Sequence, residues 1–108
     1  MDTLTDNENE RKHSYLTPAC KIQLLEALEF MAKYSLKKAK MMYDKFFQIT
    51  ELLETWPEIG TLYTNGLRRF LLGRFPYFIY YREKEKNIEV VGIWHTSKGT
   101  EFVESAET

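Results

Sequence analysis

Cysteine, proline and glycine are scarce in the 108 residues, and the sequence contains no long apolar run. The lone Cys20 excludes an internal disulfide and suits a reducing compartment. With three prolines and five glycines, the sequence is neither collagen-like nor of low complexity. No stretch approaches the roughly 18 apolar residues that span a bilayer, and the first residues lack the basic-then-apolar order of a signal peptide. We therefore expect one soluble, cytoplasmic domain with no membrane segment.

Charge is unevenly distributed, although the net charge is only −1. Residues 1–10 carry four acids and residues 101–108 carry three, and neither segment contains lysine or arginine. All fifteen basic residues fall in 11–100 against nine acids, so the body of the chain has a charge of +6. A basic body suggests an anionic partner, either nucleic acid or an acidic protein segment. A solvated, lysine-rich helix face explains the same charges equally well.

Hydrophobic residues make up 44% of the chain, enough for one core. The first dozen residues are nearly devoid of them. We therefore divide the chain into a disordered acidic leader (1–12), a folded domain (13–100) and an acidic tail (101–108).

Apolar periodicity predicts two helices. Thr17 followed by Pro18 is typical of a helix start, and the first helix is expected over about 18–34, after a short strand-like stretch at Tyr15 and Leu16. Ser35 begins a second helix over about 36–54, so the pair forms an antiparallel hairpin. The first buried stripe is expected to include Ile22, Leu25, Leu28 and Ala32, broadened by Leu24 and Met31. The second stripe, at spacings of 3 and 4, is Ala39, Met42, Phe46, Ile49 and Leu53.

After Gly60 the period changes to that of strands, which are expected over 66–72, 77–82 and 88–95. In the last strand we place Ile88, Val90, Gly92 and Trp94 on one face and Glu89, Val91, Ile93 and His95 on the other. Because both faces are mostly apolar, this strand should lie inside the sheet. The fold class is α+β, with an N-terminal helical hairpin packed on a twisted antiparallel sheet in the order β-α-α-β-β-β.

One group of side chains could carry chemistry. His95 could transfer a proton, and nearby cations could stabilise the charge that develops when RNA is cleaved. The cations concerned are Arg68, Arg69, Arg74, Arg82 and Lys98. The alternative is that His95 merely ends a strand and the arginines solubilise a sheet edge. No metal-ligand or nucleotide-binding motif occurs, so we expect neither a metal nor another cofactor.

Five aromatic residues occur within 75–81, including Tyr77 and Tyr80, between Arg74 and Arg82. They could form a platform on which bases stack. We favour the alternative, in which alternate residues enter the core and the others form a hydrophobic groove for a partner peptide. Cys20 is interpreted as a packing residue because no base lies near it in the sequence.

Between about Tyr15 and Lys98, short motifs follow one another in a recognisable order and spacing. They are Thr17-Pro18-Ala19, Trp56-Pro57-Glu58-Ile59-Gly60, Gly66-Leu67-Arg68-Arg69, Arg74-Phe75-Pro76-Tyr77-Phe78-Ile79-Tyr80-Tyr81 and Ile88-Glu89-Val90-Val91-Gly92-Ile93-Trp94-His95. In this arrangement the chain resembles the ParE/RelE superfamily of toxins from bacterial type II toxin–antitoxin systems.

The resemblance implies a helical hairpin on an antiparallel sheet and a growth-inhibiting toxin of a plasmid stabilisation or addiction system. It also implies a cognate antitoxin that wraps and neutralises the toxin, with a homodimer or a toxin–antitoxin hetero-oligomer as the assembly. Two branches differ in target. RelE-like toxins cleave mRNA on the ribosome, whereas ParE-like toxins resemble inhibitors that bind and poison DNA gyrase and are not known as nucleases.

Side chains favour the ParE-like branch. Basic residues common in RelE-like members are replaced here by Phe78 and Leu71, and no tyrosine follows His95. We therefore predict a protein-binding inhibitor of gyrase, with a ribosome-dependent nuclease or an inactive interaction module as alternatives. The residues predicted to bind the target or the antitoxin are Arg68, Arg69, Arg74, Tyr77, Tyr80, Arg82, His95 and Lys98. If the protein is a nuclease, the catalytic residues come from His95, Arg68, Arg69, Arg74 and Lys98.

Overall fold

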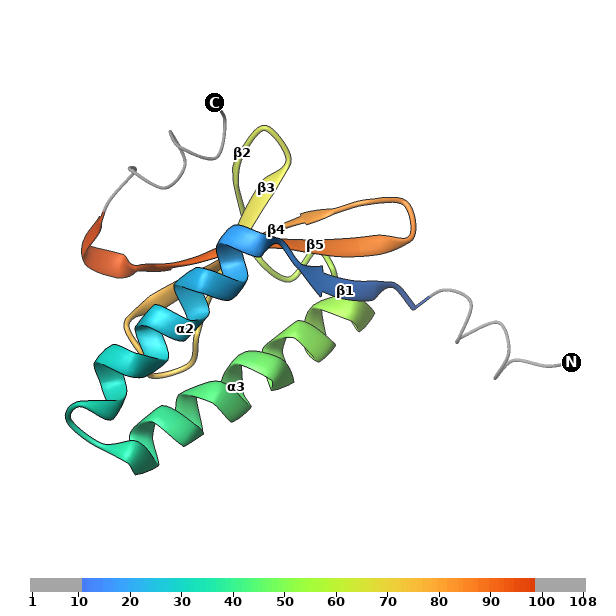
Figure 1. Cartoon of the computed structure of the whole chain (residues 1–108). Coiled ribbons are helices and arrows are strands. Elements are labelled where there is room, and N and C mark those ends of the chain that lie inside the picture. Colours follow the sequence, from blue (N-terminus) through green and yellow to red (C-terminus); the bar gives the residue numbers. More distant parts are fainter. Residues whose placement is uncertain (1–10, 99–108) are drawn as a thin grey trace, which may run out of the picture.

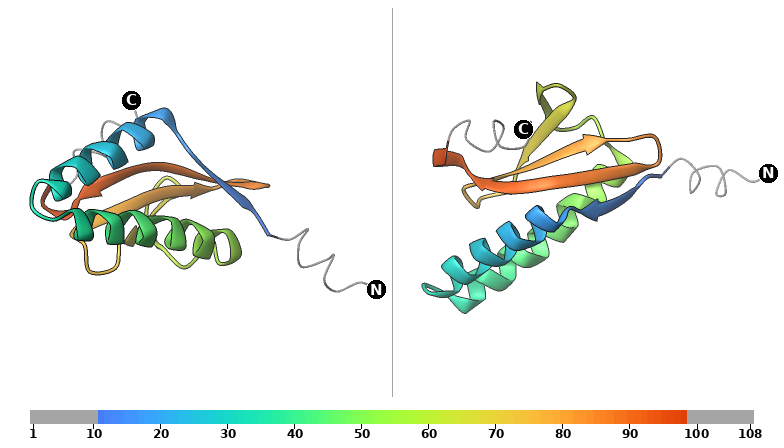
Figure 2. Two further views of the ribbon diagram at one scale, coloured as in Figure 1. Left: turned by 60° about the horizontal axis from the view of Figure 1, so that its bottom comes forward. Right: turned by 45° about the horizontal axis from the view of Figure 1, so that its top comes forward.

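The computed structural model describes residues 11–98 (Figure 1). The elements, in chain order, are β1 (His13–Leu16), α2 (Pro18–Ala32), α3 (Leu36–Thr55), β2 (Thr61–Thr64), β3 (Leu67–Leu71), β4 (Tyr77–Glu83), β5 (Asn87–His95) and the short 3-10 helix η1 (Thr96–Lys98). The two helices form a hairpin that covers one face of the sheet, as both views in Figure 2 show. The predicted α+β class and helical hairpin are therefore confirmed. No helix within the described part of the chain is long and apolar enough to cross a membrane.

The sheet has the order β1-β5-β4-β3-β2. Three of its pairings are antiparallel, as expected, but β1 runs parallel to β5. Because β5 pairs with β1 on one side and β4 on the other, its predicted interior position is confirmed. The sheet is mixed rather than wholly antiparallel, because the helical hairpin carries the chain across one face between β1 and the remaining strands.

The strand β2 is absent from the predicted order. It forms a hairpin with β3 through Asn65 and Gly66, which both have positive φ (45° and 79°). An Asn-Gly pair is a strong signal for a two-residue hairpin turn. A strand expected from Gly66 onward leaves no place for this turn, so β2 was not predicted.

The α3 stripe is confirmed, since Met42, Phe46, Ile49 and Leu53 are buried and only Ala39 is half-buried. The α2 stripe is right only in part. Leu24 is buried, and Leu28 and Met31 pack against the core, but Ile22 and Leu25 are 59% and 57% exposed. The other buried residues of α2 are Cys20 and Ala27. The small side chains of Cys20 and Ala27 turn toward the sheet, where they fit between the helix and the strands. The expected stripe was built around the larger apolar residues.

A β-bulge also corrects the predicted faces of β5. Tyr80 pairs with Gly92 and Tyr81 with Val90, so Val91 is the extra residue of the strand. Beyond the bulge, Ile93 joins Ile88 and Val90 in the core beneath the helices. Trp94 instead packs on the opposite face with Tyr80. A bulge exchanges the faces of all residues that follow it, and strict alternation could not anticipate this.

Both helix starts have the predicted caps. The side chains of Thr17 and Ser35 each accept a hydrogen bond, at 3.1 Å, from the backbone N–H three residues further on. Arg11 and Lys12, assigned to the leader, instead belong to the folded domain because they form ion pairs with Glu54 and Glu83. The rest of the predicted leader, and the tail from 101 onward, lie outside the described residues.

Candidate functional site

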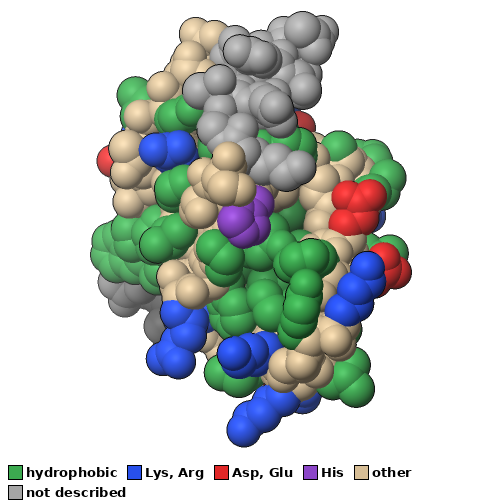
Figure 3. All heavy atoms as spheres, turned by 90° about the vertical axis from the view of Figure 1, so that its left-hand side faces the viewer, with side chains coloured by type: hydrophobic (Ala, Val, Ile, Leu, Met, Phe, Trp, Pro, Cys, Tyr) green, Lys and Arg blue, Asp and Glu red, His purple; other side chains and the backbone are tan. Residues whose placement is uncertain are grey.

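The carboxyl end of β5 places His95 at the mouth of a hollow between α2 and the sheet. This His95 hollow has a volume of about 480 Å³ and is mostly apolar. Its lining comprises Gln23, Glu26, Ala27, Phe30, Tyr77, Ile93, Trp94, His95 and Ser97. Figure 3 shows this end of the molecule, where a histidine lies among hydrophobic side chains and basic side chains stand at the margin. A hydrophobic hollow with a few polar groups at its edge is the usual form of a binding site.

Within the hollow, the imidazole of His95 has a defined orientation. Its Nδ1 accepts the backbone N–H of Ser97 at 3.1 Å and lies 2.8 Å from the Ser97 hydroxyl oxygen. Its ring meets that of Tyr77 edge to face at 5.1 Å between centroids. When the ring is neutral, acceptance at Nδ1 leaves its proton on Nε2. Burial raises the pKa of the Tyr77 hydroxyl, so this group stays protonated at physiological pH.

The sheet face opposite the helices, here called the open face, carries a second cluster. The Arg69 guanidinium carbon lies 4.4 Å from the Tyr63 ring centroid and 4.2 Å from that of Phe78. Leu67 and Tyr80 are buried beside them, and Val91 and Trp94 pack against the same group. Trp94 is also among the residues that line the His95 hollow.

The other predicted arginines are dispersed. Arg68 donates to the carbonyl oxygens of Gly60 at 2.8 Å and Glu58 at 3.4 Å, holding the chain that enters β2. Arg74 lies at the β3–β4 turn, in a separate hollow against α3. Arg82 lies opposite Glu89 in the register of β4 and β5. Alternation along β4 places its side chain on the open face. The side chain of Lys98 is outside the described part of the structure.

The structure therefore unites only some of the predicted residues. His95 and Tyr77 share the His95 hollow, and Arg69, Tyr80 and Arg82 share the open face. Arg68 and Arg74 lie elsewhere. Across residues 11–98, no group of three His, Cys, Asp or Glu side chains is placed to hold a metal ion.

Cys20 is fully buried in the core, which confirms its interpretation as a packing residue. Burial raises the pKa of its thiol to about 12, because the charged thiolate would lose its hydration. The thiol is therefore protonated and unreactive at physiological pH.

Tyr81 was missed as an important residue and fixes the loop after α3. Its buried hydroxyl donates to the Pro57 carbonyl oxygen at 2.7 Å and accepts the Gly60 N–H at 2.8 Å. A Cβ atom at Gly60 would collide with this hydroxyl and with the Arg69 carbonyl oxygen, so glycine is required there. The motif Trp56-Pro57-Glu58-Ile59-Gly60, followed by a Tyr-Tyr pair, was the only signal in the sequence.

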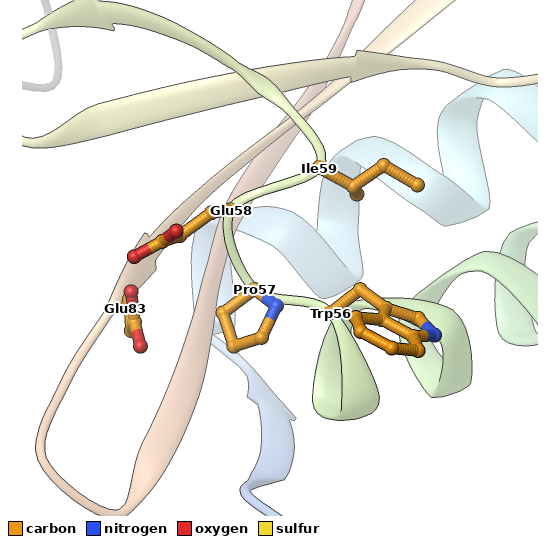
Figure 4. Close-up of a pocket in the computed structure, with 5 residues that line it drawn as sticks. All are labelled: Trp56, Pro57, Glu58, Ile59 and Glu83. Carbon is orange, nitrogen blue, oxygen red and sulfur yellow. The ribbon is translucent and has the colours of Figure 1, made fainter.

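The same loop borders a smaller hollow of about 360 Å³, lined by Trp56, Pro57, Glu58, Ile59 and Glu83. Figure 4 shows the carboxylates of Glu58 and Glu83 turned toward each other, whereas the indole of Trp56 points away from them. Glu83 already forms an ion pair with Lys12 at 3.4 Å. Both carboxylates are exposed, and none of the predicted site residues lines this hollow, so the site is assigned to the His95 hollow and the open face.

The fold is a helical hairpin on one face of a five-stranded sheet, with partly exposed aromatic and basic side chains on the opposite face. Residues 15–99 match the family described as "ParE toxin of type II toxin-antitoxin system, parDE". The chain belongs to this ParE toxin family.

A solved chain of the chromosomal ParDE TA system from P. aeruginosa has the same fold, with a TM-score of 0.70 and 18% sequence identity. The match covers 80% of the present chain and 97% of that one. Among proteins of curated function, none matches the chain.

Proposed function

We propose that this ParE family member inhibits growth in the cytoplasm by binding and poisoning DNA gyrase. A cognate antitoxin neutralises it, and the toxin–antitoxin pair stabilises a plasmid. The central support is the open face, where Arg69 lies over the rings of Tyr63 and Phe78. Arginine and large aromatic side chains are enriched among the residues that dominate protein–protein binding energy. A preorganised arginine among aromatic rings suits recognition of a protein surface.

The positions of the cations also favour binding over RNA cleavage. Cleavage requires positive charge gathered around the phosphate that reacts. Here Arg68 is turned toward the Gly60 carbonyl, Arg74 lies against α3, and Arg69 is held by two rings. Among the described side chains, none of these guanidinium groups lines the His95 hollow.

The His95 hollow is proposed as the site of an apolar anchor from the antitoxin. Phe30 is 50% exposed at its edge, and Ala27 leaves room beside it. An apolar side chain seated there would cover Phe30, while acidic residues of the antitoxin would approach the basic body of the toxin.

Gyrase poisoning is tested by adding purified protein to gyrase with relaxed plasmid, and separately to a purified translation system. We expect supercoiling to fail and cleaved plasmid to accumulate, with translation unaffected. The Arg69→Ala and Phe78→Ala variants should be weaker gyrase inhibitors, whereas Lys86→Ala, an exposed cation distant from the open face, serves as control. The proposal would be overturned if the protein cut mRNA at specific codons in the translation system and left gyrase supercoiling unaffected.

A ribosome-dependent nuclease is the second candidate, since His95 is hydrogen-bonded to Ser97 and meets the Tyr77 ring edge to face. The variant His95→Gln separates the two. An enzyme that uses His95 for proton transfer should lose about 10²–10⁴-fold in rate. A binding inhibitor, whose energy comes from several contacts, should lose toxicity only in part. Absence of any growth effect from the wild-type chain would instead support an inactive interaction module.

The antitoxin site is tested with Phe30→Ala. We expect weaker binding of the neighbouring gene's product by calorimetry, because the variant removes one wall of the His95 hollow. Leu62→Ala is the control, because Leu62 on β2 is similarly exposed (59%) but distant from the hollow. Equal affinity of both variants would exclude the His95 hollow as the anchor site.

A further inference from the structure

We propose that the outward face of α3 pairs with α3 of a second copy of this chain, antiparallel and about a two-fold axis. The face is a row of residues beside the buried stripe, here called the α3 row. It consists of Leu36, Lys40, Tyr43, Phe47 and Glu51. The spacing of 3 and 4 places these residues on one side of the helix.

The middle of the α3 row is apolar and in contact with water. Tyr43 and Phe47 are 48% and 37% exposed, and their rings meet edge to face at 5.0 Å. Leu36, at the beginning of the row, is 77% exposed. On α2, Ile22 and Leu25 are exposed as well, on the side turned away from its buried residues. Exposed apolar side chains that lie together, as Tyr43 and Phe47 do, often mark a protein-interaction surface.

The charges of α3 are arranged against its own dipole. Lys37, Lys38 and Lys40 lie near its amino end, whereas Glu51 and Glu54 lie near its carboxyl end. A helix is stabilised by the reverse order, with acids at the amino end and bases at the carboxyl end. Its first turn contains no acid and its last turn no base. With respect to the helix dipole this arrangement is unfavourable, although the ion pair with Arg11 offsets the effect at Glu54.

An antiparallel copy makes the same arrangement favourable. About an axis between Tyr43 and Phe47, Lys40 of each copy faces Glu51 of the other, and the aromatic pairs meet in the middle. Such an interface is isologous, with one surface complementary to itself. The intrachain contact of Lys40 is weak, since it lies 3.6 Å from Asp44 and both side chains are mostly exposed. This self-complementary order of charges identifies the occupant as a second copy.

The α3 row shares no residue with the His95 hollow, and the open face lies on the opposite side of the sheet, so neither is part of the proposed dimer interface. Dimer formation through the α3 row does not depend on binding to gyrase or to the antitoxin. The dimer and the proposed function can therefore be tested separately.

The test is light scattering after size-exclusion chromatography of the full chain, over a range of micromolar concentrations. We expect twice the chain mass of 12.9 kDa. Either Lys40→Glu or Glu51→Lys alone brings like charges together at both symmetry-related contacts of the dimer. Each should raise the dissociation constant of the dimer about tenfold or more. The double variant should restore the dimer. A mixture of the two single variants should form a heterodimer, because each then supplies the charge that the other lacks.

Lys86→Glu, an exposed charge reversal in the β4–β5 loop, is the matched control and should remain dimeric. Circular dichroism and the thermal midpoint of each variant show that it is folded. A monomeric wild-type chain would overturn the proposal and leave the α3 row to a different protein. A dimer that is insensitive to both reversals would overturn it too, by placing the interface elsewhere.

Discussion

The two faces of β4 differ in what their aromatic residues do. Toward the helices, Tyr77, Ile79 and Tyr81 are buried in the main core. On the open face, Phe78 and Tyr80 form a thin cluster with Arg69 above it. One strand rich in aromatic residues thus contributes to the main core on one side and to the open face on the other. Alternation in a strand allows these two demands to be met by neighbouring residues.

The largest effect on stability is expected in the core between the helices and the sheet, from Phe46→Ala. Phe46 is fully buried at the centre of the core, so its loss leaves a cavity and should cost about 3–5 kcal/mol of unfolding free energy. Urea denaturation measures the loss. Phe30→Ala, on a half-exposed ring, should cost less than half as much. Similar losses for both variants would contradict the assigned core.

The two helices show how far periodicity reaches. In α3 the large apolar residues recur at regular spacing, and the predicted stripe is the buried one. In α2 apolar residues occur on every side, and two small ones, Cys20 and Ala27, face the sheet. The buried side of α2 is set by how closely the helix approaches the strands. This is a property of the tertiary structure, so the spacing of large apolar residues does not predict it.

The next effect concerns the hydroxyl of Tyr81. Tyr81→Phe leaves the Gly60 N–H and the Pro57 carbonyl without this partner in a buried place and should cost about 1–3 kcal/mol. Thermal and urea unfolding measure it. Tyr34→Phe is the control, because Tyr34 is 74% exposed, and should leave stability unchanged. An unchanged midpoint for Tyr81→Phe would mean that water replaces the hydroxyl.

A smaller, pH-dependent effect is expected at Glu54, which fastens β1 to α3. Burial alone would raise the pKa of this carboxyl, but hydrogen bonds from Ser14 and the Arg11 guanidinium outweigh burial and lower its pKa. Because the folded pKa is lowered, the stabilisation is complete above the ordinary glutamate value of about 4.3 and is lost as the pH falls through the lower folded value.

Glu54→Gln should therefore lose about 1 kcal/mol at neutral pH and show a flatter decline of unfolding free energy below about pH 4.3 than the wild-type chain. Glu85→Gln removes the same charge from an exposed loop and should keep the wild-type slope. Identical slopes for Glu54→Gln and wild type would show that the carboxylate does not stabilise the fold.

The candidate site was only partly accessible from the sequence. The basic and aromatic residue types were recognised, and His95 was placed at a strand end, where it lies. The distribution of these residues between the two faces of the sheet was not predicted, because the bulge at Val91 exchanges the faces on which Ile93 and Trp94 lie. Nor could the sequence tell Arg68 from Arg69, since adjacent arginines are equivalent until the strand has a register and a neighbouring loop.

This last pair yields the sharpest comparison, and its Arg69 variant is expected to have the smallest effect on stability. Arg68 lies beneath β2 and donates to backbone carbonyls, so Arg68→Met should cost about 1–2 kcal/mol as these acceptors lose a charged donor. Arg69 lies over two rings on the open face, so Arg69→Met should cost only about 0.5–1 kcal/mol, the worth of a partly exposed cation–π contact. Partner binding should follow the opposite order, because only Arg69 is displayed to a protein that docks on the open face. Unfolding in urea and inhibition of gyrase, measured on both variants, separate the two quantities. If Arg68→Met weakened binding more than Arg69→Met without destabilising the fold, the docking surface would lie at the β2 edge instead of the open face.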